Sequence, residues 1–348
     1  MQPSKFSLSF FRIWYTRLFV AIFLVASYFL LVRSSDGGIA SFDASFWGQR
    51  KLIAQFADLR LALGDRVFPN VLVGQDGWLI FTAEGSVDDY QNTLALPYEP
   101  TEEIRAGIIR LQARLAARGG TLLVVIVPNK PTVYPEIVPA EIGKFSETSR
   151  LNLLSAYLEQ NLPETVLLDL RPILAEGRTV HDVYYKTDTH WNDYGIYLAY
   201  QAILQKLSET RPELAPYPLE MFDLAEGQPE VLDLAANTGS VSLREPLLTL
   251  KPKFEIPVTY RQLEGGSRKL YTAWGTEQNL PRLLMYHDSF GPRLFNLLSM
   301  HFSNSVSVPH YSGRPIWSTN WVDQQQPDVV IIEIAERYLH DLGVLLTQ

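Results

Sequence analysis

Three residue types that together perform nucleophilic catalysis stand in two short polar stretches of the chain. Residues 186–195 read KTDTHWNDYG, which places Asp188 two positions before His190, and residues 283–291 read LLMYHDSFG, which contains Ser289. A serine hydroxyl is a poor nucleophile near neutral pH, so it needs a base within hydrogen-bonding reach, and that base needs an orienting group. If the two stretches meet in space, Ser289 is the nucleophile, His190 the general base and Asp188 the acid that orients the base.

The spacing of these residues suits the roles. In an extended loop, side chains two positions apart point to the same side, so Asp188 can bond Nδ1 of His190 and leave Nε2 free for Ser289. Ser289 follows an apolar run and precedes a helical pattern, a position that resembles a nucleophile elbow although the G-x-S-x-G pattern is absent. Its own backbone N–H, at a helix N-terminus, can donate to a developing oxyanion.

The same residues have simpler interpretations. An Asp-x-His pair occurs in many polar loops, and Asp288 with Ser289 can act only as the N-cap pair of a helix. A metal site made of Asp188, His190 and Asp193 is a third interpretation, but no further histidine cluster accompanies these residues. We therefore expect neither a metal ion nor an organic cofactor.

Aromatic and cationic side chains near the two stretches are candidates for substrate contact. The indole and phenol rings can stack on a sugar or merely pack, and the guanidinium groups can hold an anionic substrate or be solvated at the surface. The candidates are Trp191, Tyr194, Arg293, Arg314, Trp317 and Trp321.

Alternating strands and helices must position these residues. Apolar runs at 121–127, 165–170, 282–287 and 328–334 predict buried strands, and periodic patterns at about 102–115, 146–160 and 192–209 predict helices, the last capped by Asn192. This order predicts an α/β fold with a mainly parallel sheet. Ligands bind beyond the carboxyl ends of such strands, which places PNKPTVYPE (128–136), HDSFG (287–291) and EIAERY (333–338) on one rim.

The segments outside this pattern predict additional parts. Residues 43–65 predict an amphipathic helix beside a membrane, and VLVGQDGWLIF at 71–81 predicts a hairpin that turns at Gln75-Asp76-Gly77. Residues 211–280 contain several prolines and predict an insertion with a small β subdomain. The resulting division is 1–34 for the cytoplasmic N-terminus and membrane anchor, 35–99 for the lead-in and 100–348 for the catalytic domain.

Composition excludes several classes of protein. The 348 residues are 47% hydrophobic, which is enough for a large core, and the formal net charge of −8 argues against a nucleic-acid-binding protein. The chain has no cysteine, which excludes disulfide scaffolds, thiol nucleophiles and cysteine-ligated zinc.

The N-terminus predicts a membrane anchor. The uncharged run LFVAIFLVASYFLLV at 18–32 follows Lys5, Arg12 and Arg17, whereas Arg33 alone follows it. The excess of basic residues before the run places the N-terminus in the cytoplasm and the rest of the chain in the periplasm. A cleaved signal peptide is the alternative, but the sequence after the run lacks a clear small-x-small cleavage pattern.

Five stretches taken together resemble the SGNH hydrolase-like domain of the AlgJ and AlgX type of alginate O-acetylation protein. They lie at 71–81, 127–136, 187–195, 287–291 and 327–339, in the family's order, and the D-T-H-W-N segment at 188–192 is the most specific of them. The resemblance implies a three-layer α/β/α fold and a triad in which the Asp-x-His pair precedes the serine. The nucleophile, base and orienting acid then correspond to Ser289, His190 and Asp188.

The resemblance also implies partners and a location. Such proteins are anchored in the inner membrane or lie in the periplasm, act on a polysaccharide, and receive acetyl groups from a multi-pass membrane O-acyltransferase of the MBOAT type. Two departures stand out: His287 occupies a position where many members have a small residue, and no C-terminal carbohydrate-binding module precedes Gln348.

We therefore expect a polysaccharide O-acetyltransferase of the cell envelope that works through an acetyl-serine intermediate. A carbohydrate acetylesterase with the same triad is the alternative enzyme, because only the acceptor differs. A non-catalytic scaffold that binds polymer in an exopolysaccharide synthesis complex is the alternative from another class.

Overall fold

The computed structural model describes residues 20–25, 49–94, 98–162, 166–263, 270–310 and 320–347. The chain divides into two compact units, residues 1–60 and 61–348. Helix α3 (Gln49–Ala62) lies within the predicted helical segment 43–65. No helix in the described ranges is long and apolar enough to cross a membrane, and most of the predicted anchor at 18–32 lies outside those ranges.

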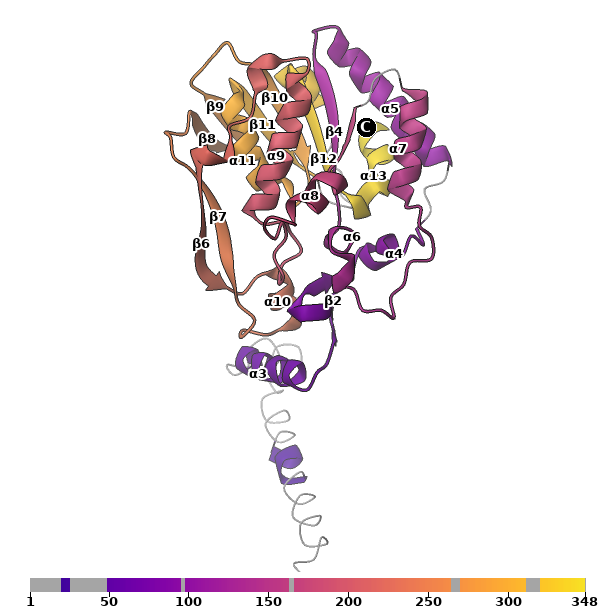
Figure 1. The fold of residues 1–348 in the computed structure, drawn as a ribbon, viewed down its shortest axis with the longest axis vertical. Helices are drawn as coiled ribbons and strands as arrows, with labels where there is room; N and C mark the ends of the chain where they lie inside the picture. The colour runs from indigo at the N-terminus through magenta and orange to yellow at the C-terminus, as the bar shows by residue number, and fades with distance from the viewer. Residues whose placement is uncertain are drawn as a thin grey trace, which may run out of the picture. The chain divides into compact units, whose positions relative to one another are not determined.

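A seven-stranded mixed sheet forms the centre of the 61–348 unit (Figure 1). Its spatial order is β5-β4-β12-β10-β11-β9-β8. The first five strands pair in parallel, and β9 pairs antiparallel with both β11 and β8. The strands are β4 (Thr121–Val127), β5 (Leu167–Asp169), β8 (Val258–Leu263), β9 (Leu270–Gly275), β10 (Arg282–His287), β11 (Asn304–Pro309) and β12 (Val329–Ala335). The predicted parallel core is confirmed, and the antiparallel edge makes the sheet mixed.

The region predicted as an insertion differs from that prediction in its second half. Strands β6 (Phe222–Glu230) and β7 (Glu245–Pro252) do form a separate two-stranded sheet, with α10 (Asp233–Thr238) between them in sequence. Strands β8 and β9, however, extend the main sheet beside β11. Strand β8 is largely exposed and reads VTYRQL, so it lacks the apolar pattern that identifies a core strand.

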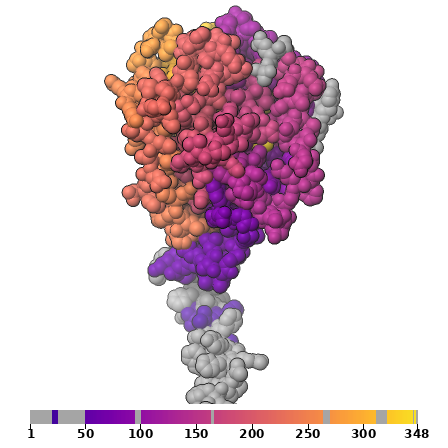
Figure 2. All heavy atoms as spheres, in the orientation of Figure 1, coloured from indigo at the N-terminus to yellow at the C-terminus, as the bar shows by residue number. Residues whose placement is uncertain are grey.

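Helices cover the sheet on both sides. Helix α9 contacts α8 and α11, whereas α5 contacts α7 and α13, and Figure 1 shows these two groups apart. In the space-filling view the salmon and orange later segments occupy the left of the visible face and the magenta ones its right (Figure 2). The helices are α4 (Ser86–Tyr90), α5 (Tyr98–Ala116), α6 (Lys130–Val133), α7 (Arg150–Asn161), α8 (Arg171–Gly177), α9 (Asp193–Ser208), α11 (Gly291–Leu298), α12 (Asn320–Gln325) and α13 (Leu339–Thr347).

Burial explains why the central strands form where they do. Strands β10 and β12 and all but the first residue of β4 are almost entirely buried, as expected for apolar strands covered on both faces. Asn192 caps α9 as predicted, because its side-chain oxygen accepts the backbone N–H groups of Tyr194 and Gly195 at 3.0 Å each.

The predicted hairpin is present and reaches the polar loop at 186–190. Strands β2 (Val71–Val73) and β3 (Leu79–Phe81) pair around the short 3-10 helix Gln75–Gly77, and β1 (Val67–Phe68) extends the pair to three strands. The backbone N–H of Leu79 donates to the carbonyl of Lys186 at 2.8 Å. The hairpin therefore helps to fix the loop that carries Asp188 and His190.

Candidate active site

The two polar stretches meet at the carboxyl ends of the parallel strands. Nε2 of His190 lies 2.9 Å from Oγ of Ser289, and Nδ1 of the same ring lies 2.7 Å from Oδ1 of Asp188. Asp188 also accepts the backbone N–H of His190 at 2.8 Å, so its carboxylate fixes both the ring and the main chain of the histidine. The three residues form one continuous hydrogen-bonded chain.

The electrostatics of the chain favour proton transfer from the serine. A carboxylate only accepts, so Nδ1 of His190 carries a proton and Nε2 presents a lone pair to the Ser289 hydroxyl. Burial alone would lower the pKa of His190, but the hydrogen bond and charge of Asp188, with the charge of Asp233, raise that pKa above its ordinary value. Burial alone would likewise raise the pKa of Asp188, but its bonds to His190 hold that pKa below its ordinary value.

A tight turn presents Ser289 to solvent between two buried residues. Asp288 and Phe290 are buried while Ser289 is exposed, and the N–H of Gly291 donates to the carbonyl of Asp288 at 3.2 Å. Asp288 accepts the N–H of Phe290 at 2.8 Å and that of Ala335 at 2.7 Å, which ties the turn to the end of β12. Asp288 therefore supports the turn and does not face the reaction.

His287, the departure from the family pattern, lies buried beneath this turn. Its Nδ1 donates to the carbonyl of Asp288 at 2.7 Å, since a carbonyl can only accept, and its Nε2 then accepts the hydroxyl of Ser307 at 2.6 Å. Burial lowers the pKa of His287 to about 4, so the ring is neutral near pH 7. A Cβ at Gly291 would come within 2.2 Å of the His287 side chain, so only glycine fits there.

Lys130 holds the loop that carries Asp188 and His190. Its ammonium donates to three backbone carbonyls, those of Tyr185 at 3.1 Å, Lys186 at 3.1 Å and Asp188 at 2.6 Å. The three N–H bonds of an ammonium match these three acceptors. Burial lowers the pKa of Lys130 to about 8, against the opposing charges of Asp188, Asp233 and Glu245.

The segment between α9 and β10 contributes a second support of the same loop. The Glu245 carboxylate on β7 accepts the N–H of Lys186 at 2.9 Å and, from Thr187, the N–H at 2.8 Å and the hydroxyl at 2.7 Å. The N–H groups of Leu234 and Ala235 both donate to the carbonyl of Thr187 at 3.1 Å. The predicted insertion therefore forms part of the site.

Asp233 is a second carboxylate beside the histidine. Its Oδ2 lies 3.6 Å from Nδ1 of His190, and its Oδ1 accepts the N–H of Thr189 at 2.7 Å. The sequence alone predicts no role for Asp233, Glu245 or Lys130. The first two lie in a segment without a catalytic motif, and only the position of Lys130 at the end of an apolar strand could have indicated a role.

Asp188, His190 and Asp233 also have the composition of a metal site, with ligand atoms within 4.8 Å of one another. Protein donors already engage these atoms: Asp188 binds the backbone and ring of His190 and the N–H of Asp233, while Asp233 binds the N–H of Thr189. The Nδ1 proton points at Asp188, where a metal would need a lone pair. The arrangement fits a hydrogen-bonded acid–base chain better than a metal site.

Two of the predicted substrate contacts pack in the interior. Trp191 is 2% exposed and donates its ring N–H to the carbonyl of Phe290 at 3.2 Å, and Tyr194 is also buried. Their burial matches the alternative interpretation, in which the two rings pack in the interior. Trp191 instead links the loop at 186–190 to the turn that carries Ser289.

The remaining predicted contacts have different environments. Arg293 forms a short ion pair with Asp193 and keeps half of its side chain exposed, at the edge of a pocket of about 160 Å³ that Tyr260 and Asn296 also line. Trp321 packs against the core. Arg314 and Trp317 lie outside the described residues.

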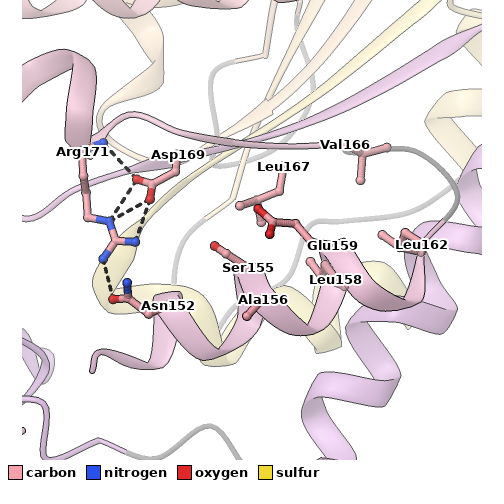
Figure 3. Close-up of a pocket in the computed structure, with 10 residues that line it drawn as sticks. All are labelled: Asn152, Ser155, Ala156, Leu158, Glu159, Leu162, Val166, Leu167, Asp169 and Arg171. Carbon is pink, nitrogen blue, oxygen red and sulfur yellow. Dashed lines mark hydrogen bonds and ion pairs between the residues drawn. The ribbon is translucent and has the colours of Figure 1, made fainter. Parts of the chain in front are cut away.

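A larger pocket of about 300 Å³ lies between α7 and the edge strand β5 (Figure 3). Arg171 at its rim binds Asp169 and the side chain of Asn152, the latter at 3.1 Å. The residues that line this pocket include none of Asp188, His190 or Ser289. We therefore assign it no part in the chemistry.

Comparison with known proteins identifies a family for this chain. The model of the SGNH hydrolase-like domain of the acetyltransferase AlgX matches residues 71–262. The probable alginate O-acetylase AlgJ of Pseudomonas putida is 26% identical over 167 residues, which cover 48% of this chain and 41% of that protein. The AlgJ of Pseudomonas aeruginosa is 27% identical over 192 residues, which cover 54% and 46%. The chain thus spans less than half the length of these two relatives.

Solved structures share the fold. PatB1 of Bacillus cereus, determined with a sulfonyl adduct, superimposes with a TM-score of 0.58 at 16% identity, over 77% of this chain and 97% of that one. The O-acetyltransferase domain of Pseudomonas putida AlgJ superimposes with a TM-score of 0.51 at 20% identity, over 78% and 92%. At these identities the superpositions show a shared α/β fold, and the SGNH hydrolase-like family is shown by the family model.

Proposed function

Because this chain belongs to the SGNH hydrolase-like acetyltransferase family of AlgX, we propose that it transfers acetyl groups to polysaccharide hydroxyls through an acetyl-Ser289 intermediate. The observation that carries the proposal is the unbroken chain of contacts from Asp188 through His190 to the exposed Ser289 hydroxyl. Such a chain activates a hydroxyl nucleophile in acyl transfer.

In the first half of the reaction, His190 Nε2 takes the hydroxyl proton as Oγ of Ser289 attacks the carbonyl carbon of an acetyl donor. The tetrahedral intermediate collapses when the imidazolium returns this proton to the leaving group, and acetyl-Ser289 remains. Among the described residues, none accepts the backbone N–H of Ser289. We propose that this N–H donates to the oxyanion of the intermediate.

In the second half, neutral His190 removes the proton of a sugar hydroxyl as its oxygen attacks the acetyl carbon. The proton then returns from His190 to Oγ, which regenerates the serine and releases the acetylated sugar. Asp188 stays ionised throughout and stabilises the imidazolium in both halves.

The proposed setting of the reaction follows the relatives. The two AlgJ relatives are described as probable alginate O-acetylases, and we propose that the acceptor here is also an exopolysaccharide. We further propose an N-terminal anchor in the inner membrane, a catalytic unit in the periplasm, and an MBOAT-type membrane acyltransferase as acetyl supplier. The half-exposed Arg293 and its pocket are the candidate contact for an anionic polymer.

A carbohydrate acetylesterase is the second candidate, because the same side chains serve both reactions and Ser289 is open to solvent. The two enzymes differ in whether water or a sugar hydroxyl attacks acetyl-Ser289.

One assay separates these candidates. The full-length protein is incubated with a chromogenic acetyl ester and candidate oligosaccharides, and acetylated sugar is quantified beside free acetate for wild type and Ser289→Ala. We expect acetylated sugar to form only with wild type. Acetate without acetylated sugar would identify an esterase, and equal product from both proteins would refute the nucleophile.

A further inference from the structure

The imidazole of His190 faces two carboxylates on its Nδ1 side. Asp188 makes the hydrogen bond at 2.7 Å, and Oδ2 of Asp233 lies 3.6 Å from the same nitrogen. Their side chains are 15% and 37% exposed, so neither charge is fully screened by water. The triad needs only one of the two acids, so the position of the second requires an explanation.

The local hydrogen bonds leave one oxygen of Asp233 directed at the ring. Its Oδ1 is occupied by the N–H of Thr189 at 2.7 Å, whereas Oδ2 makes the 3.6 Å contact with Nδ1. The backbone N–H of Asp233 donates to Oδ2 of Asp188 at 3.3 Å. The two acids and the histidine thus form one connected cluster, although Asp233 comes from α10.

Charges of both signs act on the cluster. Burial and the charge of Asp188 raise the pKa of Asp233, whereas His190 opposes that rise. The Lys130 ammonium, from α6, donates to the backbone carbonyl of Asp188, and its positive charge attracts both carboxylates. The negative charge of Asp288 also raises the pKa of His190 and so favours the imidazolium.

We propose that Asp233 is a second positioning carboxylate of His190, which stabilises the imidazolium formed during proton transfer and occupies Nδ1 when Asp188 is removed. This inference rests on the proposed function, in which the imidazolium forms twice per turnover. Asp233 would act through His190 and would not touch the substrate.

A purely structural role for Asp233 makes a different prediction. If the residue only anchors Thr189, asparagine serves equally well, because its amide oxygen can accept the same N–H. If the charge matters, Asp233→Asn keeps that bond but makes the imidazolium form of His190 less stable, so the pKa of His190 falls. This variant therefore separates the two roles.

The test is a titration of the His190 ring by NMR in the full-length protein labelled at histidine, with His190→Gln to assign the resonance. We expect Asp233→Asn to lower the pKa of His190 by about 1 pH unit. Glu245→Gln is the matched control: it neutralises another carboxylate that holds the same loop, through Lys186 and Thr187, and we expect a smaller change.

The same titration in the Asp188→Ala background tests the replacement of Asp188. We expect Asp233→Asn to lower the pKa further there than in the wild-type background, because Asp233 is then the nearest acid to Nδ1. Alanine is used because an asparagine amide could donate to Nδ1 and hold the wrong tautomer. An equal or smaller effect in this background would refute the replacement role.

Activity gives an independent readout of the charge. We expect the acid limb of the Asp233→Asn pH–rate profile to move with the titrated pKa and kcat to fall about 5-fold. An unchanged His190 pKa in Asp233→Asn would overturn the inference even if the protein is an active acetyltransferase. A protein without Ser289-dependent activity would refute the proposed function, while the titration would still decide the role of Asp233.

Discussion

His190 Nε2 and Ser289 Oγ lie 2.9 Å apart although 99 positions separate the two residues in sequence. The contact forms because the turn after β10 and the loop before α9 both lie at the same edge of the parallel sheet. This edge carries the proposed nucleophile and the proposed base, and Lys130, Asp233 and Glu245 contact the loop that holds the base.

The activity should depend on pH through His190. The general base must be neutral, so the rate rises as pH increases through its pKa and reaches a plateau above it. Since Asp188 and Asp233 raise that pKa above its ordinary value of 6.5, we predict a midpoint of the acid limb above pH 6.5. Initial rates with an uncharged acetyl ester, corrected at each pH for Ser289→Ala, measure this midpoint; a value below pH 6.5 would contradict the geometry.

Lys130 should matter for catalysis without touching the substrate. Lys130→Met preserves the length of the side chain but leaves the carbonyls of Tyr185, Lys186 and Asp188 without their shared donor. We predict a loss in kcat of about 30-fold, which corresponds to ~2 kcal/mol. Lys206→Met is the control, since Lys206 pairs with Glu209 at the surface. Equal kcat values for the two variants would show that the loop does not need its anchor.

Gly291 should tolerate no larger residue. A Cβ there would approach Cβ and Cγ of His287 at 2.2 and 2.3 Å, so Gly291→Ala must displace the turn that carries Ser289. We predict a loss in kcat of at least about 10-fold, or ~1.4 kcal/mol. Gly143→Ala, where an added Cβ meets nothing within 4 Å, should retain wild-type kcat. A fully active Gly291→Ala would mean that the turn adjusts freely.

The sequence predicts the central strands and the triad better than the surroundings of the triad. Strands β4, β10 and β12 are continuous apolar runs because both faces are buried, so their pattern identifies them. Strand β11 reads NSVSVP. It is not a continuous apolar run, because Ser305 and Ser307 are buried within it, so the apolar pattern does not identify it. Asp188 and His190 stand only two positions apart in sequence, which makes their pairing predictable.

The supports of the triad depend on tertiary contacts that sequence spacing does not encode. Asp233 reaches His190 from a position 43 residues later, within a segment of weak pattern. Trp191 was predicted as a possible sugar contact because aromatic residues occur both in cores and in sugar sites. In the structure its ring is buried and packs against Phe290.

The buried ion pair between Arg150 and Asp89 should contribute strongly to the free energy of unfolding. Arg150 and Asp89 are each 3% exposed and 2.7 Å apart, and Arg150 also donates to the carbonyls of Glu336 and Arg337. Arg150→Met leaves the Asp89 carboxylate buried without its cationic partner, and we predict a loss of about 3–5 kcal/mol in the free energy of unfolding.

Urea denaturation measures this loss. Arg105→Met is the control, because Arg105 and Glu102 form a partly exposed pair of the kind that contributes at most ~1 kcal/mol. Equal unfolding free energies for the two variants would show that the buried pair adds no more than the exposed one.

The central claim, covalent catalysis by Ser289, is tested most directly by trapping the intermediate. The protein is mixed briefly with a chromogenic acetyl ester, quenched in acid, digested and examined by peptide mass spectrometry. We predict one added acetyl group on Ser289, which is absent in Ser289→Ala and strongly reduced in His190→Gln, and which disappears when an acceptor oligosaccharide is added before the quench. Acetylation of another residue, or labelling that Ser289→Ala leaves unchanged, would contradict the account.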